Sequence, residues 1–178
     1  IVVGNTVRIL GLVDGNVRAA GNDVEIANTV GKNVTVAGST VTLTKDAVVN
    51  GTFAAASAIL NVAGTVKHQI DAAVSEVTVS GVVDGDLRLR AGDAEPAVRL
   101  TDTAKVGGTF RYSAAQKAEI ASGAVISGPT MYTEKVVKNP APFLRAFHFF
   151  RTTVKFFGII LVGLVRLGLG RIFSDEVV

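Results

Sequence analysis

Apolar residues recur in a five-residue frame, apolar-x-Gly-x-apolar, through the first 131 residues of the chain. The frame is first seen as Val13-Asp14-Gly15-Asn16-Val17. It returns at residues 30–34, 49–53, 66–70, 83–87, 106–110 and 126–130, at steps of 17, 19, 17, 17, 23 and 20 residues. Apolar positions that alternate over so few residues predict very short β-strands.

A second apolar pair follows seven residues after the end of each of the first four frames. Small residues, such as Ala20-Gly21 and Ala37-Gly38, lie between the two and indicate a corner. We therefore expect the apolar positions of both strands to form the core. The core residues predicted are Val17, Val24, Ile26, Val34, Val41, Leu43, Val77 and Val79.

One copy of about 18 residues cannot bury its own apolar side, whereas stacked copies can cover one another. The repeat therefore predicts an all-β fold, a β-solenoid of about 17–18 residues per coil, over residues 1–131. The long step between residues 83 and 106 predicts an insertion at a corner, around residues 93–97, where Pro96 cannot donate to a strand ladder.

Charged residues at the outward positions test this stacking. In-register coils would set Arg8 over Glu25, Arg99 over Glu119 and Asp71 over Arg88, which are favourable pairs between neighbouring strands. Arg88 over Arg111 is the exception. Exposed pairs of this kind contribute well under about 1 kcal/mol each, so they adjust register and do not hold the coils together.

A different pattern begins after the repeats. We assign residues 132–142, with Pro140 and Pro142, to a linker, residues 143–173 to a membrane-spanning or interfacial amphipathic helix, and residues 174–178 to a tail. The residues expected within the membrane are Phe156, Phe157, Ile159, Ile160, Leu161, Val162, Leu164 and Val165. The residues expected at its interface are Arg145, Arg151, Lys155, Arg166 and Arg171.

The charge is unevenly divided between these parts. Residues 1–131 have a net charge of −1 and residues 132–178 a net charge of +4. The basic residues thus flank the apolar run, as is typical of membrane segments, and a nucleic-acid-binding face on the repeats is not supported.

The repeats, with the stretches 106–113 and 123–128 and the Pro-rich joint before a Phe/Leu helix, resemble the bactofilins, polymer-forming bacterial cytoskeletal proteins. The likeness is greatest to bactofilin-like proteins of the membrane-anchored type and covers nearly the whole chain. The resemblance implies a right-handed, three-sided β-helix that assembles end to end without nucleotide and acts as a scaffold at membranes. The apolar C-terminal segment departs from the soluble tails of cytoskeletal bactofilins.

Two arguments about the side of the membrane on which the solenoid lies point in opposite directions. The basic residues before the helix centre place the solenoid in the cytoplasm by the positive-inside rule. The resemblance, and a first residue in mid-coil without Met, instead suggest that a signal peptide has been removed. We therefore expect a cell-membrane protein with an extracytoplasmic solenoid, the cytoplasmic face being the alternative.

Few residues are candidates for chemistry. The chain has no Cys and only two His, His68 and His148, so the His cluster of a metal-dependent hexapeptide-repeat enzyme is missing. His68 stands in a column otherwise rich in Gly, where a left-handed turn would tolerate it. Asp84 and Asp86 flank Gly85 and are better explained as a solvated turn than as a cation site.

We therefore expect a protein that is not an enzyme and that needs no cofactor, metal or small-molecule substrate. The favoured function is a membrane-anchored scaffold that self-associates or docks onto a larger membrane assembly, with membrane lipid and further copies as partners. The alternatives are a membrane-tethered module that binds cell-wall glycan or a protein, and a hexapeptide-repeat acyltransferase. An exposed row of aromatic side chains would favour the glycan-binding module.

Overall fold

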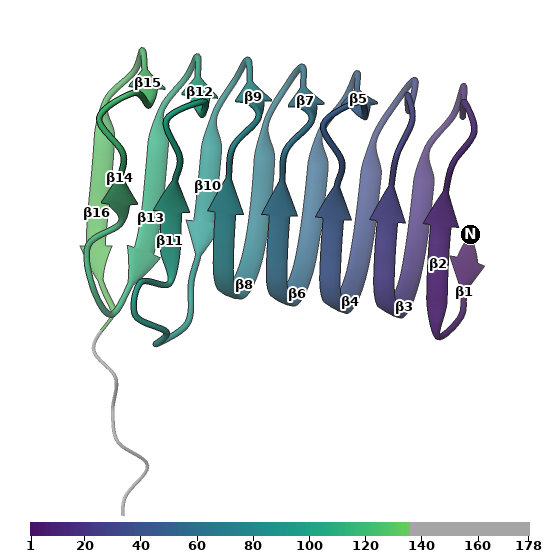
Figure 1. Ribbon diagram of the computed structural model, residues 1–178, viewed down its shortest axis with the longest axis horizontal. Helices are drawn as coiled ribbons and strands as arrows, with labels where there is room; N and C mark the ends of the chain where they lie inside the picture. Colours follow the sequence, from purple (N-terminus) through teal and green to yellow (C-terminus); the bar gives the residue numbers. More distant parts are fainter. Residues whose placement is uncertain (136–178) are drawn as a thin grey trace, which may run out of the picture. The chain divides into compact units, whose positions relative to one another are not determined.

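The computed structural model describes residues 1–135, which form a parallel β-solenoid of about eight turns (Figure 1). Every pair of neighbouring strands in this part of the chain is parallel. The prediction of an all-β solenoid is confirmed. Within residues 1–135 no helix is long and apolar enough to cross a membrane. The expected membrane and interface residues lie outside the described residues.

Two of the three strand segments of a coil come from one bent strand of ten residues. These strands are β3 (Val17–Ile26), β4 (Val34–Leu43), β6 (Phe53–Val62) and β8 (Ile70–Val79). Val17 and Ala19 of β3 point inward, then the alternation changes phase, and Val24 and Ile26 point inward. The phase change marks the predicted corner between two outward surfaces.

In the other coils the same two segments are separate strands. At the N-terminal end they are β1 (Val2–Val3) and β2 (Thr6–Ile9). Toward the C-terminal end they are β10 (Leu87–Arg90), β11 (Val98–Leu100), β13 (Phe110–Ala114), β14 (Glu119–Ile120) and β16 (Thr130–Glu134). These strands and the four long ones make one 11-stranded sheet.

The third segment of each coil is a two-residue strand. These strands, which stack as a 5-stranded sheet, are β5 (Val48–Val49), β7 (Thr65–Val66), β9 (Val82–Val83), β12 (Lys105–Val106) and β15 (Val125–Ile126). The first residue of every predicted frame is paired with the next, from Val13 to Val30 and onward to Ile126. The unequal steps of the repeat are therefore absorbed in the loops, while the register is kept.

The core is a set of apolar columns that run along the stack. All eight predicted core residues are buried, the most exposed being Val17 at 6%. The largest fully buried side chains include Phe53 and Phe110, which occupy the first strand segment of their coils. No buried residue in the described part of the chain is polar or charged. Burial of this apolar surface, at roughly 25 cal/mol per Å², is therefore what stabilises the stack.

Glycine marks places where neighbouring coils come very close. The described residues include none with a positive φ, so the left-handed turn considered for the column of His68 is not present. Instead, a Cβ atom on Gly85 would lie 2.1 Å from the carbonyl oxygen of His68 in the coil before it. Close approach of the coils thus favours Gly at this position, although Lys32 and His68 occupy the same column in other coils.

The predicted insertion is the loop of residues 91–97 between β10 and β11, which confirms its place. Lys135 reaches it with an ion pair to Asp93 (Nζ to Oδ1, 3.5 Å) and a hydrogen bond to the carbonyl of Ala91 (3.3 Å). Gln116 donates a hydrogen bond to Glu95 in the same loop. The strand β16 also runs to Glu134, three residues past the end expected for the solenoid.

Candidate functional surfaces

The two surfaces of the bent strands differ in how their charges are used. We call the outward side of the first segments, on β1, β3, β4, β6, β8, β10, β13 and β16, the first-strand face. The outward side of the second segments, on β2 to β4, β6, β8, β11 and β14, is the second-strand face. Both are flat, because the strands in each are held in register.

On the second-strand face, the predicted charge pairs are formed. Arg8 Nε lies 3.2 Å from Glu25 Oε2, and Arg99 Nε lies 3.0 Å from Glu119 Oε2. The outward row between these pairs consists of Thr42, Asn61 and Thr78. These four charges are therefore neutralised in pairs, whereas Asp23 and Glu76, in another outward row of this face, form no ion pair with a described residue.

On the first-strand face, the outward charges are not paired in the same way. Asp71 and Arg88 are aligned as predicted, but Arg88 forms its ion pair with Asp86 of its own coil (2.8 Å). Gln69 donates to Asp71 instead (2.6 Å). Arg18 forms no ion pair with any residue of the described chain.

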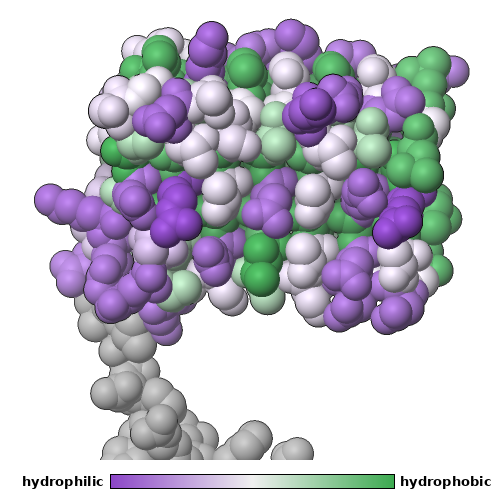
Figure 2. Space-filling view, viewed as in Figure 1, coloured by the Kyte–Doolittle hydropathy of each residue, from purple (hydrophilic) through white to green (hydrophobic). Residues whose placement is uncertain are grey.

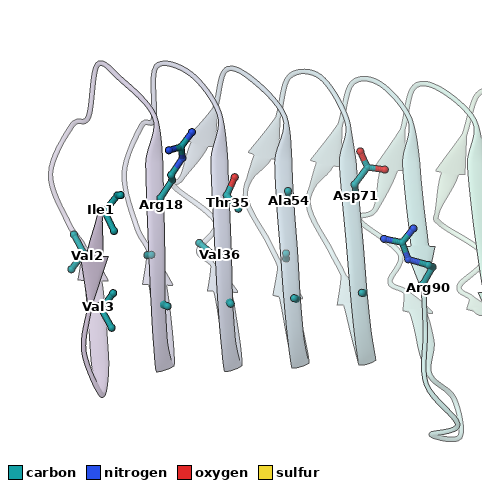
Figure 3. A pocket seen from close by; sticks show the side chains of 15 residues that line it. Ile1, Val2, Val3, Arg18, Thr35, Val36, Ala54, Asp71 and Arg90 are labelled. Atoms are coloured by element: carbon teal, nitrogen blue, oxygen red, sulfur yellow. The ribbon is translucent and has the colours of Figure 1, made fainter.

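A shallow apolar groove of about 490 Å³ lies on this face across β1, β3, β4, β6 and β8 (Figure 3). Its floor is formed mainly by alanine side chains, and Arg18, Asp71 and Arg90 stand at its rim. Outward alanines recur at one position in four successive coils, at Ala20, Ala37, Ala56 and Ala73. Alanine exposes apolar surface without blocking the close approach of another surface.

A second hollow, of about 280 Å³, lies farther along the same face and carries three arginines. Arg88 lies directly over Arg111, which repeats the like-charge exception noted in the sequence. Arg111 donates a hydrogen bond to the sulfur of Met131 (3.7 Å) and forms no ion pair with a residue of the described part. Like charges directly opposite each other on neighbouring strands are destabilising, so this stack is an unfavourable feature of the first-strand face.

The turn around Gly85 does not resemble a cation site. Asp84 is paired with Lys67 (3.2 Å), and Asp86 accepts hydrogen bonds from the backbone of Thr109 (2.9 Å) and from Arg88 (2.8 Å). The hydrogen bond from Thr109, with that from Arg88, holds the pKa of Asp86 below its ordinary value. Both carboxylates are thus used in joining coils.

No chemical site is evident among the described residues. His68 is exposed beside Lys67 and Asp86, without a nucleophile or an acid at hydrogen-bonding distance. Within residues 1–135, no three His, Asp or Glu side chains are grouped as metal ligands would be. The four aromatic residues of this part, Phe53, Phe110, Tyr112 and Tyr132, point into the stack and are buried or half-buried.

The aromatic residues cluster near the C-terminal end of the solenoid. The ring of Tyr112 stacks on Phe110 at 4.7 Å and lies 5.1 Å from the ring of Tyr132. The hydroxyl of Tyr132 donates to the carbonyl of Ala114 (3.3 Å), and burial raises its pKa above the ordinary value. This cluster fills the interior of the last described coils.

The N-terminal coil leaves apolar side chains in solvent. Figure 2 shows apolar residues gathered at the end of the stack that carries β1 and β2. The residues with the highest exposed fractions are Ile1 (94%), Val3 (76%), Leu12 (66%) and Leu10 (62%). Among the strands of residues 1–135, β1 and β2 pair only with β3, so the other edge of each presents backbone groups that can pair with another strand.

Comparisons with models of protein families, with curated proteins and with solved structures found no match to this chain.

The sequence pattern did not indicate the groove. The alanines of the first-strand face were noticed as corner residues, but a column of outward alanines is visible only once the register is known. The alignment of outward positions coil by coil was the signal that could have found it.

Proposed function

We propose that this protein is a non-catalytic, membrane-anchored scaffold whose copies associate through the solenoid. The observation that carries the proposal is the N-terminal coil, where Leu10 and Leu12 are exposed beside two strand edges that pair with no other strand of the described residues. An open edge with apolar side chains is a template for another strand, and soluble proteins usually protect it. A second copy that covers this end buries both the apolar side chains and the backbone groups.

The finer parts of the proposal come from the sequence. The resemblance to bactofilin-like proteins supports a right-handed, three-sided coil and assembly without nucleotide. The apolar run of residues 143–173 supports the anchor, and the resemblance favours a solenoid outside the cytoplasm. Membrane lipid and further copies of the chain, or the subunits of a larger membrane assembly, are then the partners.

The experiment is amine-reactive cross-linking of the full chain in phospholipid vesicles, after flotation has separated bound from unbound protein. We expect the protein to float with the vesicles and to give multiples of the 18.4 kDa chain on a denaturing gel. Protein that stays at the bottom of the gradient contradicts the anchor, and bound protein that gives only the monomer contradicts the scaffold.

A substitution at the N-terminal coil connects the result to the structure. Leu12→Asp places a charge among the exposed apolar residues, and we expect it to lower the cross-linked fraction. Asn61→Asp introduces the same charge in the middle of the second-strand face and is the matched control, which should cross-link as the unsubstituted chain does. Equal loss in both variants would show that added charge, and not the coil end, is responsible.

A further inference from the structure

The groove on the first-strand face has a pattern of charge that fits a reversed copy of itself. In coil order, the outward row that borders it is Arg18, Thr35, Ala54 and Asp71, so a positive and a negative side chain stand at opposite ends (Figure 3). Three coil steps of about 4.8 Å separate the two, or roughly 14 Å, which is too far for them to pair within one chain. Arg18 has no ion-pair partner among residues 1–135.

When two copies pack face to face with their coils running in opposite directions, this row of one copy lies against the same row of the other copy in reverse order. Arg18 of each copy then meets Asp71 of the other, and Thr35 meets Ala54. The neighbouring row, Ala20 to Ala73, meets itself, so that alanine faces alanine at these four positions, and Val3 faces Arg90 beyond them. Such an interface uses the same patch on both copies and closes as a two-fold dimer.

Other registers of the same packing are less favourable. Moving one copy by one coil along the stack places Arg18 against Arg88, and moving it farther places Asp71 against Asp71. One further register pairs Asp71 with Arg88, but it leaves Arg18 without a partner. The charges therefore select a single register out of those that a flat face allows, in the way that like-charge contacts exclude wrong partners in other interfaces.

The charge of the first-strand face also indicates which segment or partner fits the groove. Residues 132–178, which contain the apolar run 143–173, have a net charge of +4, and two of the three rim charges are the arginines Arg18 and Arg90. Like charge thus disfavours the chain's own C-terminal segment as the occupant. A second copy is the partner that supplies a carboxylate for each Arg18.

We infer that this groove is a lateral self-association surface, in which two solenoids pair in opposite directions through Arg18 and Asp71. The inference rests on the proposed scaffold function and names a second contact, on the outward face of the coils, whereas the first uses Leu10 and Leu12 of the N-terminal coil. The four coils present roughly 250 Å² per copy, from the strand spacing and rise, against about 800 Å² in a standard stable interface. Pairing therefore depends on the raised effective concentration of copies anchored in one membrane.

The test uses the absence of cysteine from the chain, so that an introduced thiol is unique. Full-length Ala37→Cys and Ala56→Cys proteins, distinguished by tags of different size, are mixed in phosphatidylcholine vesicles and oxidised. In the inferred register these two positions face each other, and we expect a disulfide between the two proteins in preference to dimers of either one. Disulfides need Cα atoms about 4.4–6.8 Å apart, so a different register or face would not give this preference.

Charge reversal in the same assay identifies the pair. Arg18→Asp, or Asp71→Arg, should lower the mixed disulfide about tenfold by setting like charges opposite each other, and the double variant should restore it. Arg8→Asp makes the matched change on the second-strand face and should leave the yield unchanged. A normal yield in Arg18→Asp, or no recovery in the double variant, would overturn the inference.

The Leu12→Asp variant distinguishes a failure of the lateral surface from a failure of the proposed scaffold function. If assembly through the N-terminal coil persists while the charge variants have no effect, the scaffold stands and the lateral surface is wrong. If the vesicle-bound chain forms neither contact, the scaffold itself is wrong. Circular dichroism of each variant shows whether the solenoid is retained, since all the changed residues lie on its surface.

Discussion

The two faces formed by one bent strand differ, although the same register produces both. The second-strand face pairs both of its arginines within the chain, Arg8 with Glu25 and Arg99 with Glu119. The first-strand face has an apolar groove, a cation at Arg18 that forms no ion pair with the described residues, and two arginines, Arg88 and Arg111, aligned on neighbouring strands. Stacking alone therefore does not require charges on neighbouring coils to be complementary, and the apolar groove distinguishes the first-strand face as a surface for a partner.

The largest expected effect concerns the apolar core, which lies beneath both faces. Phe53 lies beneath the first-strand face and Leu60 beneath the second, and both are fully buried. Alanine at either site leaves a cavity and should cost about 2–5 kcal/mol of unfolding free energy, Phe53 at the upper end. Denaturant unfolding of the full chain in detergent, followed by circular dichroism, measures this. A cost below about 1 kcal/mol at either site would mean that the core does not continue under that face.

The corner between the faces offers a smaller effect in the opposite direction. The hydroxyl of Ser57 is buried without a hydrogen-bond partner. Ser57→Ala should therefore stabilise the solenoid by about 1 kcal/mol, since the desolvation of that hydroxyl is no longer uncompensated. Thr103→Val is the control, because its hydroxyl donates to the carbonyl of Ser80 (2.7 Å) and its loss should be destabilising. The same sign for both changes would contradict this explanation.

A pair of mirror-image substitutions tests the charge difference between the faces directly. Arg111→Glu converts the arginine stack into an opposite pair with Arg88 and should raise stability by up to about 1 kcal/mol. Glu119→Arg converts an existing pair with Arg99 into a like-charge contact and should lower stability by a similar amount. The melting temperatures of the two variants, measured at low and high salt, check both signs. Changes that do not shrink in high salt would show that charge is not their cause.

The smallest effect is a pH dependence. The pKa of Asp86 is lower in the folded chain than its ordinary 3.8, so the unfolded chain binds its proton more tightly. The contribution of Asp86 to stability is then complete above about pH 4 and is lost as the pH falls through the lowered pKa. Thermal melts between pH 2 and pH 6 should show a weaker acid dependence for Asp86→Asn than for the unsubstituted chain. Identical acid profiles would exclude Asp86 as a contributor.

The fold could be predicted from the sequence because each coil repeats the same local requirement. The apolar frame beginning at Val13 fixes which positions face inward, and the core residues from Val17 to Val79 follow from it. The ion pairs of Arg8 and Arg99 were also predictable, since register places the partners side by side. The ion-pair partner of Arg88 was not predictable. Asp86 in its own coil competes with Asp71 for the guanidinium, and the side-chain rotamers decide which carboxylate lies closer.

The candidate surfaces were harder to predict for a different reason. Exposure at Leu10 and Leu12 depends on what covers a coil end, and no local pattern gives that. The Gly column has a spacing that suggested left-handed turns, whereas close approach between coils is the cause at Gly85. Both features arise between coils, beyond the range of sequence periodicity within one coil.

The central proposal is that solenoids associate with one another, and sedimentation velocity of the full chain in detergent tests this directly. Over a wide range of protein concentration, the account predicts a sedimentation coefficient that rises with concentration for the unsubstituted chain. Leu12→Asp combined with Arg18→Asp should remain close to the monomer at concentrations where the Asn61→Asp control associates. A chain that is strictly monomeric at every concentration, and that purifies without a partner, would contradict the account.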